Sequence, residues 1–270
     1  MLLSSWLKRI SDRIRVRRNH PDRKPKKPDR FTQLGLTRLE DRVVLTVTAA
    51  FDSIVSDQLN ILVETDTGTD EVATVDTDGT GIVIRDHLGS AIEILDGIGG
   101  SLGFSIDVNS VGSIHIVDAD PISDLENESV ILDSSNGSAF NLANGLFVES
   151  DIDSITINTA VTGVSGTVGA TGDGIHIESG ELILNASLTT SGQNIFLGGD
   201  VALGEGLSTT MSTGVTGGSI QINGSLGGTA GGSAESVSLS AGTGNIALNG
   251  VGVSGSTDLE SLTVTSAAGV

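Results

Sequence analysis

The chain has 270 residues, and its 34 acidic and 14 basic residues give it a net charge of −20. Cysteine is absent, which excludes disulfide bonds and cysteine-based metal sites. Aromatic residues make up only 3% of the chain, and no apolar run reaches the ~20 residues of a membrane-spanning helix. The many Val, Ile, Thr, Gly and Asn residues favour strands and turns. We therefore expect an all-β fold with an aliphatic core.

The charges divide the chain near residue 42. Residues 1–42 hold thirteen of the fourteen basic residues and five acids, a net +8. Residues 43–270 hold Arg85 alone against 29 acids, a net −28. The acidic body should repel nucleic acid. The basic part is expected to be a leader for the export machinery, although binding of nucleic acid or lipid is an alternative.

Three segments make up this leader. Residues 1–18 place Leu and Ile at helical spacing beside Lys and Arg, which predicts an amphipathic basic helix. Residues 19–30 contain three prolines and five basic residues, so we expect a disordered linker. Residues 30–46 follow with the sequence RFTQLGLTRLEDRVVLT.

A specific pattern ends the leader, formed by Leu39, Glu40, Arg42 and Leu45. It resembles the N-terminal export segment of many planctomycete exported proteins, in which a Leu-Glu-x-Arg-x-x-Leu-Ser-like stretch closes an Arg-rich arm. Thr46 stands where that family usually has Ser. The resemblance implies export to the cell surface or the extracellular space, and it implies no activity.

A short apolar segment, residues 43–50, follows the export pattern. Val47 and Ala49 have the spacing of the −3 and −1 residues of a cleavage site. We therefore expect a cleavage site that leaves Ala50 or Phe51 as the new N-terminus.

The body has an irregular β region at residues 51–150 and a clear repeat at residues 151–270. An eight-residue pattern, apolar at its second, fourth and eighth positions and often with Asn at the fifth, starts at residues 154, 181, 194, 219 and 245. This period near 26, with one half-step, indicates stacked coils. We expect the fifth-position asparagines to form a hydrogen-bonded ladder: Asn158, Asn185, Asn223 and Asn249.

Segments such as GGSIQINGSLGG, within residues 172–270, resemble the right-handed parallel β-helix repeats of filamentous haemagglutinin-like adhesins. The resemblance implies a parallel β-helix body and a structural or adhesive role. Its expected partners are extracellular matrix, a surface glycan or another cell-surface protein. The final residues still have a strand pattern, so we expect the repeats to be truncated or to pair with something at Val270.

Few residues suggest chemistry. His115 and His176 alternate with isoleucines, which predicts that both point outward to solvent. The absence of Cys and of closely spaced His argues against a transition-metal site and for no cofactor. Calcium is the candidate ligand, with four acids in turn-rich sequence as its possible ligands: Asp76, Asp78, Asp118 and Asp120. A solvated acidic surface explains the same residues.

These observations predict an exported structural or adhesive protein without catalytic activity. A calcium-dependent surface scaffold is the first alternative. A polysaccharide-processing β-helix enzyme is the second, but the body has no Trp or Tyr to stack on sugar rings.

Overall fold

The computed structural model describes residues 47–53, 57–63, 71–118, 127–168, 171–229, 234–252 and 259–266. All of them belong to the second of the two units into which the chain divides, residues 44–270. They form strands, turns and a single turn of 3-10 helix, which confirms the predicted all-β class for this part of the chain. No helix in these ranges is long and apolar enough to cross a membrane. The predicted leader and its export pattern lie outside the described residues.

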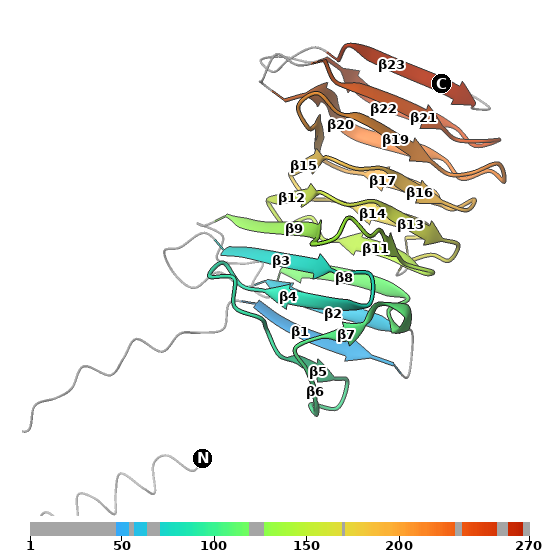
Figure 1. Cartoon of the computed structure of the whole chain (residues 1–270). Helices are drawn as coiled ribbons and strands as arrows, with labels where there is room; N and C mark the ends of the chain where they lie inside the picture. Colours follow the sequence, from blue (N-terminus) through green and yellow to red (C-terminus); the bar gives the residue numbers. More distant parts are fainter. Residues whose placement is uncertain are drawn as a thin grey trace, which may run out of the picture. The chain divides into compact units, whose positions relative to one another are not determined.

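Parallel pairing organises most strands into three ladders (Figure 1). The first ladder contains β2 (Gln58–Val63), β8 (Ser113–Asp118), β11 (Gly145–Val148), β14 (Asp173–Ile177), β17 (Asn194–Leu197) and the starts of β20 (Ile220–Gly228) and β22 (Ile246–Val251). The second ladder contains β3 (Glu71–Thr77), β9 (Glu128–Ser134), β12 (Ser154–Ile157), β15 (Glu181–Leu184), β18 (Asp200–Leu203) and the ends of β20 and β22.

The third ladder is a separate six-stranded sheet. It contains β10 (Phe140–Asn141), β13 (Val161–Val164), β16 (Leu188–Thr190), β19 (Ser208–Ser212), β21 (Ser236–Ser240) and β23 (Ser261–Ser266). From β8 onward, the chain adds one strand to each ladder in turn before it returns to the first. We call each such set of strands a round. Figure 1 shows successive rounds lying one above another.

Alternation along each strand builds the core, because successive side chains of a strand point to opposite faces. In β12, Ile155 and Ile157 are buried while Ser154 and Thr156 are half-buried. The register of the first ladder aligns the inward residues of successive rounds into an apolar column: Ile114, Leu146, Ile175, Ile195, Ile220 and Ile246. The inward side chains of each round therefore pack against those of the next round.

Glycine permits a tight corner between the first and second ladders. Equivalent positions at this corner are occupied by Gly180, Gly199 and Gly224. The residues that directly follow them, Glu181, Asp200 and Ser225, lie side by side on neighbouring strands of the second ladder. A Cβ atom on Gly199 would lie 2.7 Å from the carbonyl carbon of Gly180, and one on Gly224 would lie 2.6 Å from the amide nitrogen of Asp200. The backbone of the preceding round thus approaches Gly199 and Gly224 too closely for a side chain at these two positions.

Antiparallel strands cover the first rounds. They are β1 (Val47–Asp52), which pairs with β2, and β4 (Gly81–Arg85), which pairs with β3 and β7 (Ile106–Asp107). β5 (Ile94–Asp96) pairs with β6 (Ser101–Gly103) and lies parallel to β1, and the 3-10 helix spans Val108–Ser110. In β1, Val47, Ala49 and Phe51 are buried in the common core. The two residues that match a cleavage site are therefore core residues of a paired strand.

Candidate functional site

The most distinctive side chains on the outer face form a column of stacked rings on the first ladder. The central residues of β8, β11, β14 and β17 are His115, Phe147, His176 and Phe196, and the strand register aligns them. Ring centroids are 5.3 Å apart for His115 and Phe147, 5.5 Å for Phe147 and His176, and 4.6 Å for His176 and Phe196. These spacings follow the separation of about 4.8 Å between neighbouring strands.

Stacking changes the environment predicted for His176. Its side chain points away from the aliphatic core, as the alternation with Ile175 and Ile177 predicts, but the residue is only 7% exposed. Phe147 and Phe196 of the adjacent rounds cover its two faces. The prediction of a solvent-facing histidine is therefore wrong for His176, because neighbouring rounds place a ring on each side of it.

Two carboxylates flank this imidazole. Nδ1 of His176 lies 2.8 Å from Oδ2 of Asp173, and Nε2 lies 3.1 Å from Oε1 of Glu178. Asn194 donates to the other oxygen of Asp173 at 3.0 Å, which fixes that carboxylate. A neutral imidazole donates from one nitrogen only, so both contacts are hydrogen bonds only when the ring is an imidazolium. Since carboxylates occupy both nitrogens, the arrangement suits a structural contact better than proton transfer to a substrate.

A group of acids lies beside the ring column. Burial raises the pKa of Glu149, a backbone hydrogen bond from Asp118 opposes this, and the charges of Asp151, Asp118 and Glu178 raise the pKa further. Burial lowers the pKa of His115, because the imidazolium loses its hydration. The first ladder therefore carries titratable groups whose charge the fold disfavours.

Two of the predicted calcium ligands, Asp78 and Asp76, accept hydrogen bonds from neighbouring residues. Oδ1 of Asp78 accepts from the hydroxyl of Thr80 at 2.6 Å and from the amides of Thr80 and Gly81 at 2.8 Å each. These hydrogen bonds hold the turn between β3 and β4 and lower the pKa of Asp78 to about 2. Asp76 accepts from the Ser135 amide at 2.9 Å.

Asp118 ends β8 and is 7% exposed, whereas Asp120 lies outside the described residues. Within the described ranges, no group of three or more His, Asp or Glu side chains is arranged to hold a metal ion.

The asparagines of the repeat lie in two pairs. Asn185 donates to the side-chain oxygen of Asn158 at 2.7 Å, directly after the second-ladder strands β15 and β12. Asn249 donates to the backbone oxygen of Asn223 at 2.8 Å, on β22 and β20. Gly204 takes the position after Asn185 in the next round, so these four residues do not form one continuous ladder.

The export residues Leu39, Glu40, Arg42 and Leu45 lie outside the described residues.

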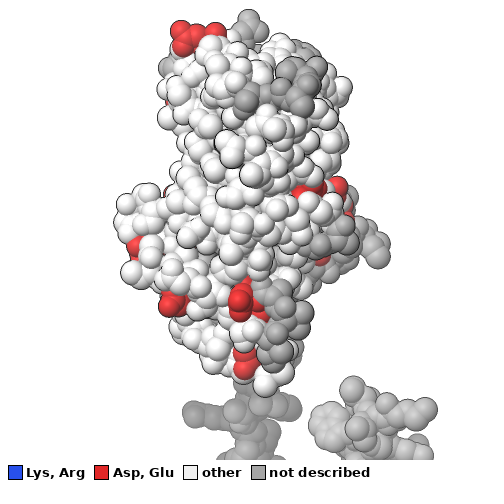
Figure 2. Space-filling model, turned by 90° about the vertical axis from the view of Figure 1, so that its right-hand side faces the viewer, with Lys and Arg blue, Asp and Glu red and all other residues white. Residues whose placement is uncertain are grey.

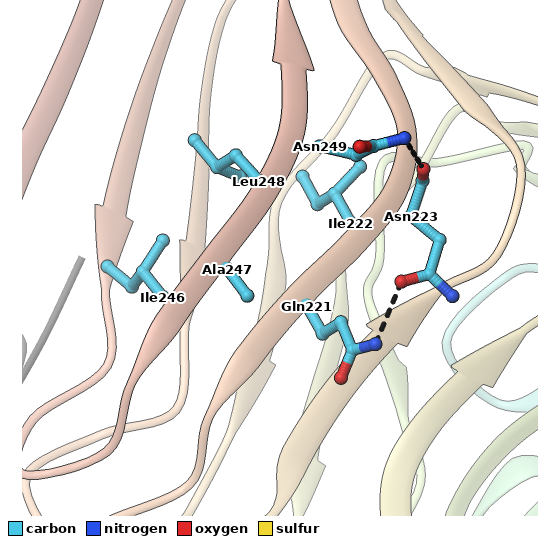
Figure 3. A pocket seen from close by; sticks show the side chains of 7 residues that line it. All are labelled: Gln221, Ile222, Asn223, Ile246, Ala247, Leu248 and Asn249. Atoms are coloured by element: carbon cyan, nitrogen blue, oxygen red, sulfur yellow. Dashed lines mark hydrogen bonds between the residues drawn. The ribbon is translucent and has the colours of Figure 1, made fainter.

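A hollow of about 610 Å³ lies at the last strands of the first ladder. It is lined by seven residues of β20 and β22 (Figure 3): Gln221, Ile222, Asn223, Ile246, Ala247, Leu248 and Asn249. Gln221 donates to the side-chain oxygen of Asn223 at 2.8 Å, and this bond orders one wall. The lining contains no ionisable group, so the hollow suits packing or hydrogen bonding better than acid–base chemistry.

Sequence reasoning missed the ring column and this hollow. A signal for the column exists, since four segments share an aromatic residue between two apolar ones: Ile114–Ile116, Leu146–Val148, Ile175–Ile177 and Ile195–Leu197. Only the register between rounds shows that the four rings stack. Compared with known proteins, the chain matches no family model, no curated protein and no solved structure.

Proposed function

We propose that the chain is an exported parallel β-helix protein with a structural or adhesive role at the cell surface and no catalytic activity. The observation that carries this proposal is the set of three parallel ladders. From β8 onward, each ladder receives a new strand every 19 to 32 residues, as in the pairs Glu181 with Asp200 and Ser113 with Gly145. Strands that return at such intervals are typical of stacked coils, in which each repeat contacts its neighbours.

The outer surface supports a binding role based on many weak contacts. The outward positions of β12, β19 and β21 are all Ser or Thr. Figure 2 shows separate acidic patches on one face with a wide uncharged area between them. A regular polar surface of this kind suits extracellular matrix, a surface glycan or another cell-surface protein.

A calcium-dependent surface scaffold is the second candidate, because Asp151, Asp118 and Glu178 bring negative charge near Glu149, although within the described ranges these acids are not arranged as a metal site. A divalent cation would relieve their repulsion. Melting of the purified protein with and without millimolar calcium tests it, with Glu149→Gln as the variant that should lose any calcium-induced shift. An unchanged midpoint in the wild type would eliminate this candidate. A reducing-end assay against a polysaccharide panel tests the glycan-enzyme alternative, and release of new sugar ends would overturn the non-catalytic proposal.

Export is tested by mass spectrometry of the protein's termini in cytosolic, envelope and medium fractions. Cleavage after Ala49 would remove two of the three buried residues of β1 and half of its register pairs with β2. We therefore move the proposed mature N-terminus to Val47 or upstream. A protein found outside the cytosol with its N-terminus at Val47 or upstream of it, but without Met1, would support the proposal. An intact Met1 in the cytosol would overturn it.

A further inference from the structure

We propose that the outward side of the third ladder binds a neutral, extended polysaccharide through rows of Ser and Thr hydroxyl groups. We call this surface the hydroxyl face, and the outward residues of β16, β19, β21 and β23 form it. The binding role in the proposed function is the basis of this inference, which narrows the partner to one class. The hydroxyl face lies along the side of the stacked rounds (Figure 1), so it does not depend on where the stack begins or ends.

Hydroxyl groups occupy the outward positions of these strands in regular rows. The outward residues of β19 and β21 lie side by side in three register pairs: Ser208 with Ser236, Thr210 with Ser238, and Ser212 with Ser240. The rows continue in the neighbouring rounds at three further residues: Thr189 beside Ser212, Ser261 beside Ser236, and Thr263 beside Ser238. Adjacent strands are ~4.8 Å apart, and alternate residues of one strand are ~6.6 Å apart. The face is therefore a lattice of hydroxyl groups with one row for each round.

Several of these hydroxyl groups are available to a ligand. Ser208 and Ser236 share a hydrogen bond of 2.7 Å with each other. Four other hydroxyl groups have no hydrogen-bond partner within the part of the chain that the structure describes: those of Thr189, Thr210, Ser238 and Thr263. Each hydroxyl group can donate one hydrogen bond and accept two. Since threonine is stiff at χ1, its hydroxyl group is largely held in place before a ligand binds.

Charge separates the hydroxyl face from the second ladder. The strands of the third ladder contain no Asp, Glu, Lys or Arg. Outward positions of the second ladder, by contrast, include Asp133 of β9, Glu181 of β15 and Asp200 of β18. Acidic side chains are sufficient to keep those strands hydrated, so solubility alone does not require rows of uncharged hydroxyl groups on one ladder.

Acids at the margin of the hydroxyl face indicate that its ligand is neutral. Glu205, in the turn before β19, and Glu260, directly before β23, are exposed, whereas Glu235, directly before β21, is fully buried. Arg85 is the only Lys or Arg among residues 43–270, and it lies on β4, outside the third ladder. A sulfated or carboxylated glycan would therefore meet repulsion and no cation to pair with.

The repeat of the lattice favours a polysaccharide over other neutral partners. One hydrogen bond exchanged with water contributes little to affinity, so a ligand gains most when it repeats the same contact many times. A chain of pyranose units laid across the strands presents hydroxyl groups, which both donate and accept, at nearly the interval between rounds. An extended peptide pairs with strand edges rather than with a sheet face. A second copy would have to bury many hydroxyl groups, which is costly unless each one finds a partner.

Co-sedimentation of the whole protein with two insoluble neutral polysaccharides, microcrystalline cellulose and chitin, tests the inference. The wild type should bind at least one of them with a saturable isotherm. Binding should be unchanged from about 0.05 to 1 M NaCl, because no ion pair contributes to it. Carboxylated cellulose is the anionic counterpart, and at the lowest salt concentration it should bind at least tenfold more weakly than the neutral form.

Two double variants locate the site. Thr210→Val with Ser238→Ala removes two adjacent hydroxyl groups from the centre of the hydroxyl face and should raise the dissociation constant about fivefold or more. Ser154→Ala with Thr156→Val is the matched control, because it removes the same kinds of group from outward positions of β12 in the second ladder. The control should bind like the wild type. Circular dichroism and the melting midpoint show whether each variant keeps its fold.

Three results would overturn the inference. A folded Thr210→Val, Ser238→Ala variant that binds like the wild type would exclude the hydroxyl face as the site, and so would equal losses in the two double variants. A wild type that sediments with neither neutral polysaccharide, or that binds carboxylated cellulose equally well, would exclude the neutral partner. None of these results bears on export, which the terminal mass spectrometry tests separately.

Discussion

Replacing Gly199 with alanine tests the close approach of rounds at the corner between the first and second ladders. The new Cβ would lie 2.7 Å from the Gly180 carbonyl carbon and closer still to the carbonyl oxygens of Ser179 and Gly180. Carbon atoms of real side chains essentially never come within 3.0 Å of such atoms. The obstacle is backbone, and the Gly180 oxygen also accepts the Asp200 amide at 3.2 Å. The ladder itself must therefore shift.

Overpacking of this kind costs typically 1–3 kcal/mol, and we expect ~2–3 kcal/mol because no flexible side chain can move aside. For a domain of this size, 1 kcal/mol changes the melting temperature by about 2–4 °C. Gly199→Ala should therefore lower the midpoint by roughly 4–12 °C. Gly97→Ala is the matched control, since its Cβ would come no closer than 3.7 Å to Asp52.

The melting temperatures of both variants are measured by circular dichroism at about 218 nm, close to the minimum of the β-sheet spectrum. The control should stay within about 0.5 kcal/mol of the wild type, as surface substitutions usually do. Equal melting temperatures for Gly199→Ala and Gly97→Ala would show that the rounds do not approach as described, and the corner geometry would have to be abandoned.

Three further predictions concern stability. The pKa of Asp78 is lowered to about 2 in the folded protein. The stabilisation from its ionised form is therefore complete above the unfolded pKa of about 3.9 and is lost as the pH falls towards 2. Asp78→Asn should have a lower melting midpoint than the wild type at pH 6, and this difference should vanish near pH 2. Because the pKa of His115 is lowered by folding, its imidazole binds a proton more readily in the unfolded chain. Stability should therefore decline as the pH falls below ~6.5. His115→Phe should reduce this decline, which melting at pH 7.5 and at pH 5.5 measures. Phe140 is fully buried, so Phe140→Ala should lower the free energy of unfolding, measured with denaturant, by about 3–5 kcal/mol. Phe104 is 57% exposed, so Phe104→Ala should lower it far less. Similar losses for the two variants would contradict the assigned core.

The strands of the repeat could be predicted closely from the sequence. The predicted starts at residues 154, 181 and 194 are the first residues of β12, β15 and β17, and those at 219 and 245 lie one residue before β20 and β22. Period-two alternation with a following turn is a local property, so it needs no tertiary information. The eighth-position residues Val161 and Leu188 likewise begin β13 and β16.

The sequence could not show which repeat segments belong to the same ladder. The half-step from 181 to 194 is the passage from the second ladder to the first, because β15 and β17 belong to different ladders. Segments of both ladders have the same pattern, since both bury alternate side chains in one core. For the same reason, Asn185 and Asn223 look equivalent in sequence although they lie on different ladders.

The candidate site depends on contacts between rounds, which local patterns do not encode. His176 alternates with isoleucines like any outward residue, and its burial arises from Phe147 and Phe196, 29 and 20 residues away in the chain. The antiparallel cover at β1 was missed because Val47 and Ala49 fit a cleavage site as well as a buried strand. Small and apolar residues satisfy both patterns.

Engineered disulfide formation tests the parallel stacking of rounds, because the chain has no cysteine of its own. Thr156 and Ile183 are register partners on adjacent strands, and Ala202 lies one strand further. Neighbouring strands lie ~4.8 Å apart, within the span of a disulfide, whereas a separation of about 9.6 Å exceeds its limit of ~7 Å. Mild oxidation should therefore cross-link Thr156→Cys with Ile183→Cys and leave Thr156→Cys with Ala202→Cys reduced. Cross-linking of both pairs to the same extent, or of neither, would contradict the stack.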